Sequence, residues 1–321
     1  MSRIVYLGFP TGQVAGGQKM ILRHVETLRA LGFDAVFWRR AANVMPRWTT
    51  YRGPVEVETD FRPDDILVVP DDAPNAIAHA ADLPLRSVVF CQNQFTFAAL
   101  GYAGVARFPP GRFPDFISVG RTCTASILRA FPEARVELVP CFADERVFRP
   151  GAAKALAIAC APRKRPFEAQ AIQAMFRRFH PAHAGIGWAI LDEAPESTVA
   201  DVFARSALFL SLSRLESVGM TPLEAMASGC VCAGFTGIGG RDFATPENGF
   251  WVAEDDCEAA ADALAEAADV VRTAGPELAR RVEAGRATAE LWSHARFQTA
   301  LEAAWMRLAP DARVSAGPLP A

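Results

Sequence analysis

Two glutamates in the second half of the chain, Glu216 and Glu224, are separated by seven residues and surround a loop that leads into a helix. An apolar run before them predicts a strand. Gly219 lets a ligand approach the backbone closely, and Thr221 and Pro222 predict the N-cap and the first residue of the helix. A helix N-terminus offers free N–H groups and about half a positive elementary charge, which suits a phosphate. Glu224, expected in the first turn, could accept two hydrogen bonds from a ribose diol, so the segment predicts a nucleotide site. The alternative is a capped helix whose glutamates only complement its dipole.

A run of three basic residues, Arg163, Lys164 and Arg165, follows the first expected strand of the second half. Departure of a nucleoside diphosphate develops negative charge on its oxygens, and fixed cations beside them stabilise the transition state. Arg163 and Lys164 are the preferred candidates, and Arg165 is a rival for the part of the lysine. A solvated basic turn is the alternative interpretation.

A glycine-rich loop, Gly8–Gly17, joins the first expected strand to the first helix. A loop in this position can contact a phosphate or an acceptor. The pattern is not G-x-G-x-x-G, and no acidic residue clearly ends the second strand. These departures disfavour a dinucleotide-dependent oxidoreductase. The alternative is a flexible turn that needs glycine only for its backbone.

Short apolar strands alternate with helices along the chain, and the alternation starts again after a break at Phe148–Gly151. Such alternation predicts parallel sheets covered by helices on both faces. The fold class is therefore α/β, with two Rossmann-like, doubly wound domains facing a central cleft. The ligand is expected at the carboxyl ends of the strands. The expected strands are 3–8, 34–38, 65–70, 87–91, 115–119 and 136–139, then 156–160, 186–191, 208–212, 230–234 and 249–252.

Composition limits the function further. Hydrophobic residues make up 51% of the chain and charged residues 21%, which excludes disorder, and the net charge of −3 disfavours a nucleic-acid partner. No run of about 18 apolar residues and no signal core is present, so we expect a cytoplasmic protein. Basic and aromatic residues gather at 37–48 and 107–113, which leaves room for peripheral contact with the inner face of a membrane.

The segment from Glu216 through Glu224 to Ala-Met-Ala-Ser-Gly at 225–229 resembles the signature of retaining GT-B glycosyltransferases, known as glycosyl transferases group 1 or family 4. The resemblance implies that Glu224 holds the ribose and that Glu216 lies over the donor sugar. It implies donor contacts from the segment between these glutamates and from the glycine-rich loop. It places Arg163 and Lys164 with Glu216 in catalysis. The further donor-binding residues that it implies are Ser217, Val218, Gly219, Met220, Thr221, Gly16, Gly17 and Arg165.

The resemblance also implies a domain plan. Residues 1–150 would form the acceptor-side domain and 151–290 the domain that binds the nucleotide sugar. Residues 291–308 would form a helix that returns to the first domain, and 309–321 a flexible tail. The activity implied is metal-independent transfer of a sugar, with retention, from a UDP or GDP type of donor to a glycan or lipid-linked acceptor. No cofactor is expected.

One departure from the family concerns the first domain. Relatives carry a histidine after a strand there, whereas this chain has Gln92 and Asn93, which could contact the sugar or the acceptor instead. The absence of the histidine leaves open a catalytically silent GT-B-like binding subunit. A nucleotide-dependent oxidoreductase is the remaining, weaker alternative.

Two groups of residues have side chains that can bind metals, but neither has the pattern of a metal site. The His180-x-x-His183 pair spans a proline and has no evident third ligand, so no zinc site is expected. Asp71 and Asp72 do not form an Asp-x-Asp motif, and we expect both to be solvated loop acids.

Overall fold

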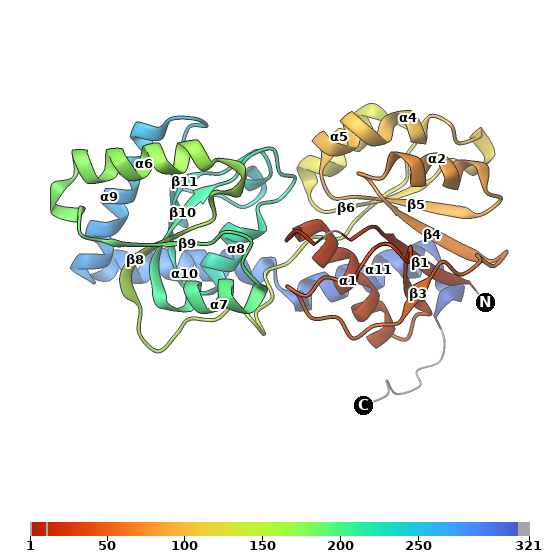
Figure 1. The fold of residues 1–321 in the computed structure, drawn as a ribbon, viewed down its shortest axis with the longest axis horizontal. Helices are drawn as coiled ribbons and strands as arrows, with labels where there is room; N and C mark the ends of the chain where they lie inside the picture. The colour runs from red at the N-terminus through yellow and green to blue at the C-terminus, as the bar shows by residue number, and fades with distance from the viewer. Residues whose placement is uncertain (1, 11, 314–321) are drawn as a thin grey trace. The chain divides into compact units, whose positions relative to one another are not determined.

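The computed structural model describes residues 2–10 and 12–313, and the chain divides into two compact units (Figure 1). The first unit consists of two segments, one that ends at Pro140 and one that begins at Phe297, and the second unit is Cys141–Arg296. Each unit contains a parallel sheet with helices packed on both faces, as the alternating apolar runs predict.

The sheet of the first unit has seven parallel strands in the order β3-β2-β1-β4-β5-β6-β7. Sequence patterns predict six of these strands and miss β3, whose two valines are exposed and therefore leave no apolar run. The strands are β1 (Arg3–Gly8), β2 (Ala35–Arg39), β3 (Val55–Val57), β4 (Asp65–Pro70), β5 (Arg86–Cys91), β6 (Asp115–Ser118) and β7 (Val136–Leu138).

Helices cover both faces of this sheet (Figure 1). On one face lie α1 (Gly16–Ala30) and α11 (His294–Leu308), and on the other lie α2 (Pro74–Asp82) and α5 (Arg121–Ala130). The segment after β5 is irregular, with one turn of α3 (Gln94–Thr96), the π-helix η1 (Phe97–Gly101), the short α4 (Tyr102–Val105) and the 3₁₀ turn η2 (Pro110–Arg112). π-Helical turns often occur at functional sites.

The end of the described chain packs on the first unit. Trp305 of α11 is buried, and its indole N–H donates to the Tyr6 hydroxyl over 3.3 Å. Residues 309–313 differ from the expected flexible tail. The Asp34 backbone amide donates to the Ala312 carbonyl at 2.9 Å, and Arg313 forms an isolated antiparallel β-bridge with Phe33. The 3₁₀ turn η6 (Pro310–Ala312) lies in this segment. The rest of the predicted tail, 314–321, lies outside the described residues.

The sheet of the second unit has five parallel strands in the order β12-β11-β10-β8-β9. All five correspond to expected apolar runs. β12 agrees at both ends, and the other four have ends that differ by one or two residues, since strand ends are set by pairing rather than by hydrophobicity. The strands are β8 (Ala155–Cys160), β9 (Gly187–Ile190), β10 (Ser206–Leu212), β11 (Val231–Phe235) and β12 (Gly249–Val252).

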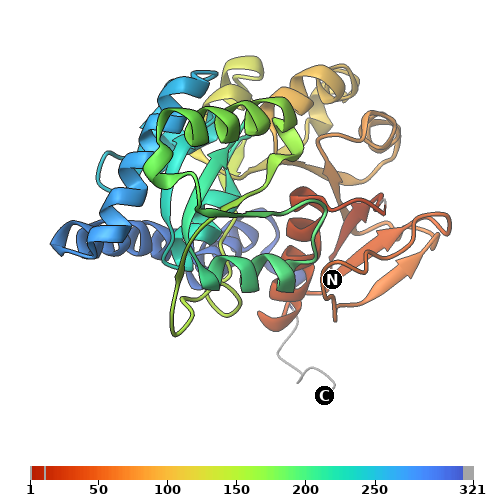
Figure 2. The same cartoon turned by 60° about the vertical axis from the view of Figure 1, so that its left-hand side comes forward.

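Two helical layers enclose the second sheet (Figure 1 and Figure 2). One layer contains α6 (Pro166–Phe179) and α9 (Cys257–Thr273). The other contains α7 (Glu196–Arg205), α8 (Met220–Ala227) and α10 (Pro276–Leu291). Alanines of α9 fill the core against the strands, so this helix can approach the sheet closely. Two 3₁₀ turns, η3 (Pro162–Lys164) and η4 (Pro181–His183), flank α6, and a third, η5 (Gly239–Asp242), follows β11.

The units divide between residues 140 and 141 rather than at the expected boundary of 150. The reason is that the segment after Pro140 packs on the second unit. The Ala143 amide donates to the Trp292 carbonyl at 2.9 Å, and the rings of Phe148 and Phe203 lie 6.3 Å apart.

Candidate functional site

The strand order of the second unit places a topological switch point between β8 and β10. The chain leaves β8 toward β9 on one side and returns to β10 on the other. Ligands of open parallel sheets bind outside the carboxyl ends of the strands at such a point. The loops that leave these two ends are 161–165 and 213–219, which are the segments that carry the basic run and Glu216.

Helix α8 begins two residues earlier than the sequence pattern predicts. Met220 is its first residue and Gly219 its N-cap, with an extended backbone and no side-chain cap hydrogen bond. Thr221 and Pro222 therefore occupy the second and third positions, and the expected N-cap at Thr221 is wrong. Glycine fits the cap because a Cβ on Gly219 would come within 3.0 Å of the Ser213 hydroxyl. The first amides of a helix lack intrahelical acceptors, so Met220 and Thr221 present N–H groups at this end.

Glu224 lies one turn into α8 rather than in its first turn. It is 6% exposed, on a helix whose residues 222–226 are all buried. Ser217 and Val218 are also buried, at 1% and 9% exposure, and the backbone of Ser217 lies against Gly239. The segment between the glutamates thus turns its middle side chains inward and leaves backbone groups at the strand edge.

Lys164 and Glu216 form an ion pair across the two loops. Lys164 Nζ lies 2.5 Å from Glu216 Oε1, with side-chain exposures of 31% and 25%. The lysine also donates to the Arg214 carbonyl at 3.5 Å. The structure therefore brings together two residues that the sequence separates by more than fifty positions, and it places a cation and a carboxylate beside the start of α8.

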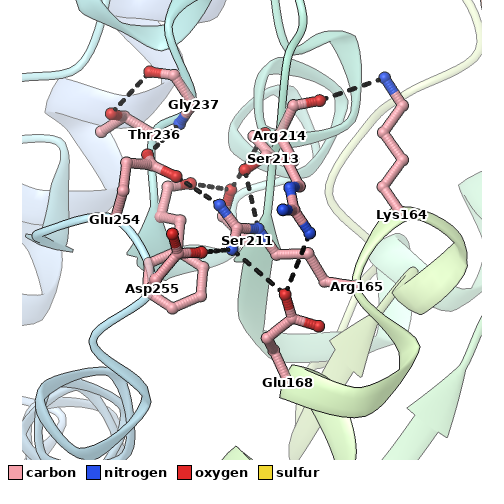
Figure 3. A network of polar contacts seen from close by, with 11 residues as sticks. Lys164, Arg165, Glu168, Ser211, Ser213, Arg214, Thr236, Gly237, Glu254 and Asp255 are labelled. Carbon is pink, nitrogen blue, oxygen red and sulfur yellow. Dashed lines mark hydrogen bonds and ion pairs between the residues drawn. The ribbon is translucent and has the colours of Figure 1, made fainter.

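The three basic residues of the run lie in three different environments. Arg163 is exposed and Lys164 is half-buried, whereas Arg165 is only 1% exposed. Arg165 forms ion pairs with Glu254 at 2.5 Å and with Asp255, and its guanidinium lies 4.6 Å from the centre of the Phe235 ring (Figure 3). Adjacent side chains at a strand end can face different directions, and their spacing in the sequence does not show which of them is buried.

Sequence reasoning misses several residues that shape the Glu216 loop. The Gly239 amide donates to the Glu216 carbonyl at 2.9 Å, and a Cβ on Gly239 would lie 2.2 Å from the Ser217 carbonyl. Glu254 and Asp255 are missed as partners of Arg165. Their position directly after β12 is the signal that could have indicated them, since all strand ends of a parallel sheet meet at one edge.

The first unit has its own strand edge with a switch point between β1 and β4. Helix α1 begins at Gly16, two residues before the expected start at residue 18, so Gly16 and Gly17 belong to its first turn rather than to the loop. Gly17 lies against Gln92. A Cβ on Gly17 would be 3.3 Å from Gln92 Nε2. The structure therefore brings together Gly17 and Gln92, two of the residues predicted on the first domain.

The side chain of Asn93 forms hydrogen bonds within its own loop. Its side-chain oxygen accepts hydrogen bonds from the amides of Phe95 and Thr96 at 3.0 and 3.3 Å and so caps α3. The backbone N–H of Asn93 donates to Asp71 Oδ2 at 3.0 Å. This oxygen is consequently a helix cap, which the sequence reading of Asn93 as a sugar contact did not anticipate.

Asp71 is a buried acid rather than the solvated one expected. It is 3% exposed at the end of β4, where the amides of residues 92 and 93 donate to it. Burial, together with the nearby charge of Asp72, raises the pKa of Asp71 to about 7. The tight turn after β4 encloses this side chain beneath the loop that follows β5.

The described residues contain neither a cluster of metal ligands nor a helix that could span a membrane. Within 2–10 and 12–313, no group of three or more His, Cys, Asp or Glu side chains is arranged to hold a metal ion. The two histidines of the His-x-x-His pair contact different carboxylates, His180 that of Asp262 at 2.8 Å and His183 that of Asp269 at 3.2 Å. No helix in this part of the chain is both long and apolar enough to cross a bilayer.

Comparison with known proteins gives one family model and one curated relative. Residues 146–269 match the model described as "Glycosyl transferases group 1", a span that holds Lys164, Glu216 and Glu224. The chain is similar to an alpha-1,6-glucosyltransferase of Actinobacillus pleuropneumoniae serotype 7, with 24% identity over 277 residues, covering 83% of each chain.

Solved structures share the fold at low sequence identity. A sucrose-phosphate synthase from Thermosynechococcus elongatus has a TM-score of 0.69 at 14% identity, over 95% of this chain and 99% of that one. The Anabaena protein HepE, in complex with UDP and glucose, has a TM-score of 0.70 at 12% identity over the same shares. The pneumococcal O-GlcNAc transferase GtfA, in complex with UDP and GlcNAc, has a TM-score of 0.70 at 9% identity, over 97% and 99%. These likenesses confirm the GT-B fold predicted from the sequence.

Proposed function

We propose that this chain, a glycosyltransferase of the GT-B fold, moves a hexosyl residue from a UDP-sugar to a hydroxyl of a glycan or lipid-linked acceptor, with retention of configuration. The observation that carries the proposal is the Lys164–Glu216 pair, 2.5 Å apart, beside the free amides at the start of α8. These groups supply a cation, helix-terminal N–H donors and a carboxylate at one strand edge, which is the set that a sugar diphosphate requires.

The diphosphate is proposed to lie against the N-terminus of α8. Lys164 and the exposed Arg163 would neutralise the charge that develops as the nucleoside diphosphate leaves. Because fixed cations can do this, we propose that transfer needs no divalent metal and no other cofactor. Glu224, buried one turn along the helix, would accept hydrogen bonds from the ribose.

Retention is proposed from the chemistry of the donor and of the relative. UDP-hexoses of the glucose type carry an α-linked sugar, and the curated relative is named for an α linkage. In same-face transfer, the acceptor hydroxyl attacks the anomeric carbon, the bond to the diphosphate breaks, and the leaving phosphate takes the proton of the acceptor. The enzyme then supplies position and charge rather than a general base.

The choice of uridine as the base rests on the solved relatives. HepE and GtfA are described in complexes with UDP. On the first unit, Gly17 and Gln92 would face the sugar or the acceptor. Contact with the inner face of a membrane, from a cytoplasmic location, remains part of the proposal as the way a lipid-linked acceptor is reached.

A thermal-shift panel of the full chain tests the donor assignment. UDP, GDP, ADP, TDP and NAD are each added with and without EDTA. A ligand at a hundredfold excess over its dissociation constant stabilises the folded state by about 2.7 kcal/mol. We expect UDP to raise the melting temperature, EDTA to leave this shift unchanged, and Glu224→Ala to remove it. The matched control is Glu266→Ala, which removes an exposed glutamate in the middle of α9.

Other outcomes of the panel would contradict parts of the proposal. A shift with NAD alone would favour a nucleotide-dependent oxidoreductase, and loss of the UDP shift in EDTA would overturn metal independence. Transfer itself is measured with radiolabelled UDP-glucose and a panel of glycan acceptors. Binding of UDP without transfer to any acceptor, and without slow hydrolysis of the donor, would favour a silent binding subunit.

A further inference from the structure

Arg165 connects the carboxyl ends of three strands in the second unit. Its Nε donates to the carbonyl of Ser213 after β10 at 3.3 Å, and its guanidinium stacks on Phe235 at the end of β11. Its terminal nitrogens form the ion pairs with Glu254 and Asp255 after β12 (Figure 3). A single buried side chain thus holds the loops that follow β10, β11 and β12.

The contacts continue from Arg165 to the Glu216 loop. The second oxygen of Glu254 accepts a hydrogen bond from the Gly237 amide at 2.8 Å (Figure 3). Gly237 has a φ of +63°, and a Cβ there would lie 3.0 Å from the Ser213 side chain. Two residues later, the Gly239 amide donates to the Glu216 carbonyl at 2.9 Å. The backbone of Glu216 is therefore linked to Arg165 through Glu254 and the turn at 237–239.

Backbone strain occurs on both sides of this network. Asp255, which pairs with Arg165, has a φ of +68°, and Leu215, which precedes Glu216, has a φ of +47°. Residues other than glycine pay a conformational cost in this left-handed region and remain there only when their surroundings hold them. The Arg165 ion pair is one contact that holds Asp255 in place.

The charge of Arg165 is compensated inside the protein. Glu254 and Asp255 both contact it, and Glu168 lies 3.4 Å away. The guanidinium lowers the pKa of Asp255, so that carboxyl stays ionised beside it. With a side chain only 2% exposed, Arg165 has little surface left for a diphosphate, whereas its neighbours Arg163 and Lys164 reach solvent.

We propose that Arg165 is a positioning residue for the transfer reaction: it fixes the Glu216 loop and the adjacent Lys164 by tying three strand ends together, and it does not bind the donor diphosphate. The effect on catalysis rests on the proposed function. The ordering of the Glu216 loop by Arg165 does not, because it can be measured in the protein without a ligand. The positioning role departs from the sequence reading, in which Arg165 is a donor ligand.

Variants on the two sides of the ion pairs separate positioning from binding. Arg165→Met removes the cation, and Glu254→Gln with Asp255→Asn removes the carboxylates while keeping the cation. Glu254 and Asp255 are 34% and 69% exposed, so water can solvate them when the arginine is lost and the unit can still fold. Arg165→Lys keeps the positive charge but lacks the planar guanidinium, which can contact two carboxylates at once. Arg281→Met is the matched control, because Arg281 pairs with Glu277 at 2.8 Å and stacks on Phe250 at 3.8 Å on the α10 side.

A positioning role for Arg165 predicts the results of three measurements, which are kcat, UDP affinity and hydrogen exchange. Both Arg165→Met and the carboxylate variant should lower kcat by about 10- to 100-fold, with UDP affinity changed by less than about threefold, since misplacement of catalytic groups has effects of that size. Both should also speed hydrogen exchange in peptides that cover 213–220 and 236–240. Arg165→Lys should recover part of kcat, and Arg281→Met should leave kcat and the exchange of these peptides unchanged.

Direct binding of the diphosphate by Arg165 would give different results. If Arg165 binds the diphosphate, Arg165→Met should weaken UDP binding as much as Lys164→Met does, and the carboxylate variant, which frees the arginine, should bind UDP more than about threefold more tightly than the wild type. Either result overturns the positioning role. If the wild type neither binds UDP nor transfers sugar, the proposed function fails, and the exchange measurement still decides whether Arg165 orders the loop.

Discussion

The ammonium group of Lys164 lies 2.5 Å from the Glu216 carboxylate, although the two residues belong to loops that follow different strands, β8 and β10. Each partner is about one-quarter to one-third exposed, so the pair sits at the strand edge rather than in the core. A diphosphate bound at the start of α8 would compete with Glu216 for the lysine. The pair therefore couples the proposed leaving-group cation to the carboxylate that is proposed to lie over the sugar.

This coupling predicts different effects for the two charge-removing substitutions. Glu216→Gln should lower the transfer rate by about 100-fold, as loss of a preorganised electrostatic contact does, while UDP affinity stays the same or increases because Lys164 is released. Lys164→Met should weaken UDP binding. Calorimetric titration with UDP and steady-state rates test both variants and their combination, and a tenfold loss of UDP affinity in Glu216→Gln would contradict the prediction.

A second prediction concerns the close approach of Gly239 to the Glu216 loop. Gly239→Ala would place a methyl group 2.2 Å from the Ser217 carbonyl, so the backbone must shift. We expect a loss of stability of about 1–3 kcal/mol, the usual cost of overpacking, together with reduced transfer. Gly185→Ala is the control, because nothing lies within 4 Å of a Cβ there. Urea unfolding followed by tryptophan fluorescence measures both, and equal stability of the two variants would refute the steric argument.

Asp71 predicts a pH dependence of stability in the first unit. Its pKa rises from 3.8 to about 7 on folding, so the folded chain binds the proton more tightly than the unfolded chain. Its contribution to stability is therefore undiminished below pH ~4, falls as the pH rises toward 7 and is constant above. Asp71→Asn should remove this dependence. The free energy of unfolding of the variant minus that of the wild type should therefore increase as the pH rises from 4 to 7. A difference that does not change with pH would show that Asp71 does not titrate in this range.

His24 predicts the opposite sign at acid pH. Burial lowers the pKa of this histidine from 6.5 to about 3, so the unfolded chain takes up the proton first. Stability should fall as the pH drops from 6.5 toward 3. His24→Phe loses the 2.9 Å hydrogen bond to Tyr6, which costs about 1 kcal/mol at pH 8, but it should lose less stability on acidification. Unfolding at pH 8 and pH 5 checks this, with the exposed His79→Gln as control; a gap between wild type and variant that does not narrow would count against it.

The sequence by itself determines the elements and the chemical character of the second unit's strand edge. Alternating apolar runs specify buried parallel strands, because both faces of such a sheet must be covered, and this pattern predicts all but the exposed strand β3. The spacing of Glu216 and Glu224 around Gly219 specifies a strand–loop–helix unit, because glycine permits a close approach to the backbone and proline fixes φ at a helix start. These are short-range effects, which a sequence expresses directly.

Only the tertiary structure decides which neighbours in sequence share an environment. Lys164 and Arg165 are adjacent, yet one meets Glu216 at the strand edge and the other is enclosed by Glu254 and Asp255. Asp71 looks like a surface acid in the sequence, but the loop after β5 folds over it. Burial and charge pairing depend on which distant strand ends meet, and that is set by the order and register of the sheet rather than by local residue preference.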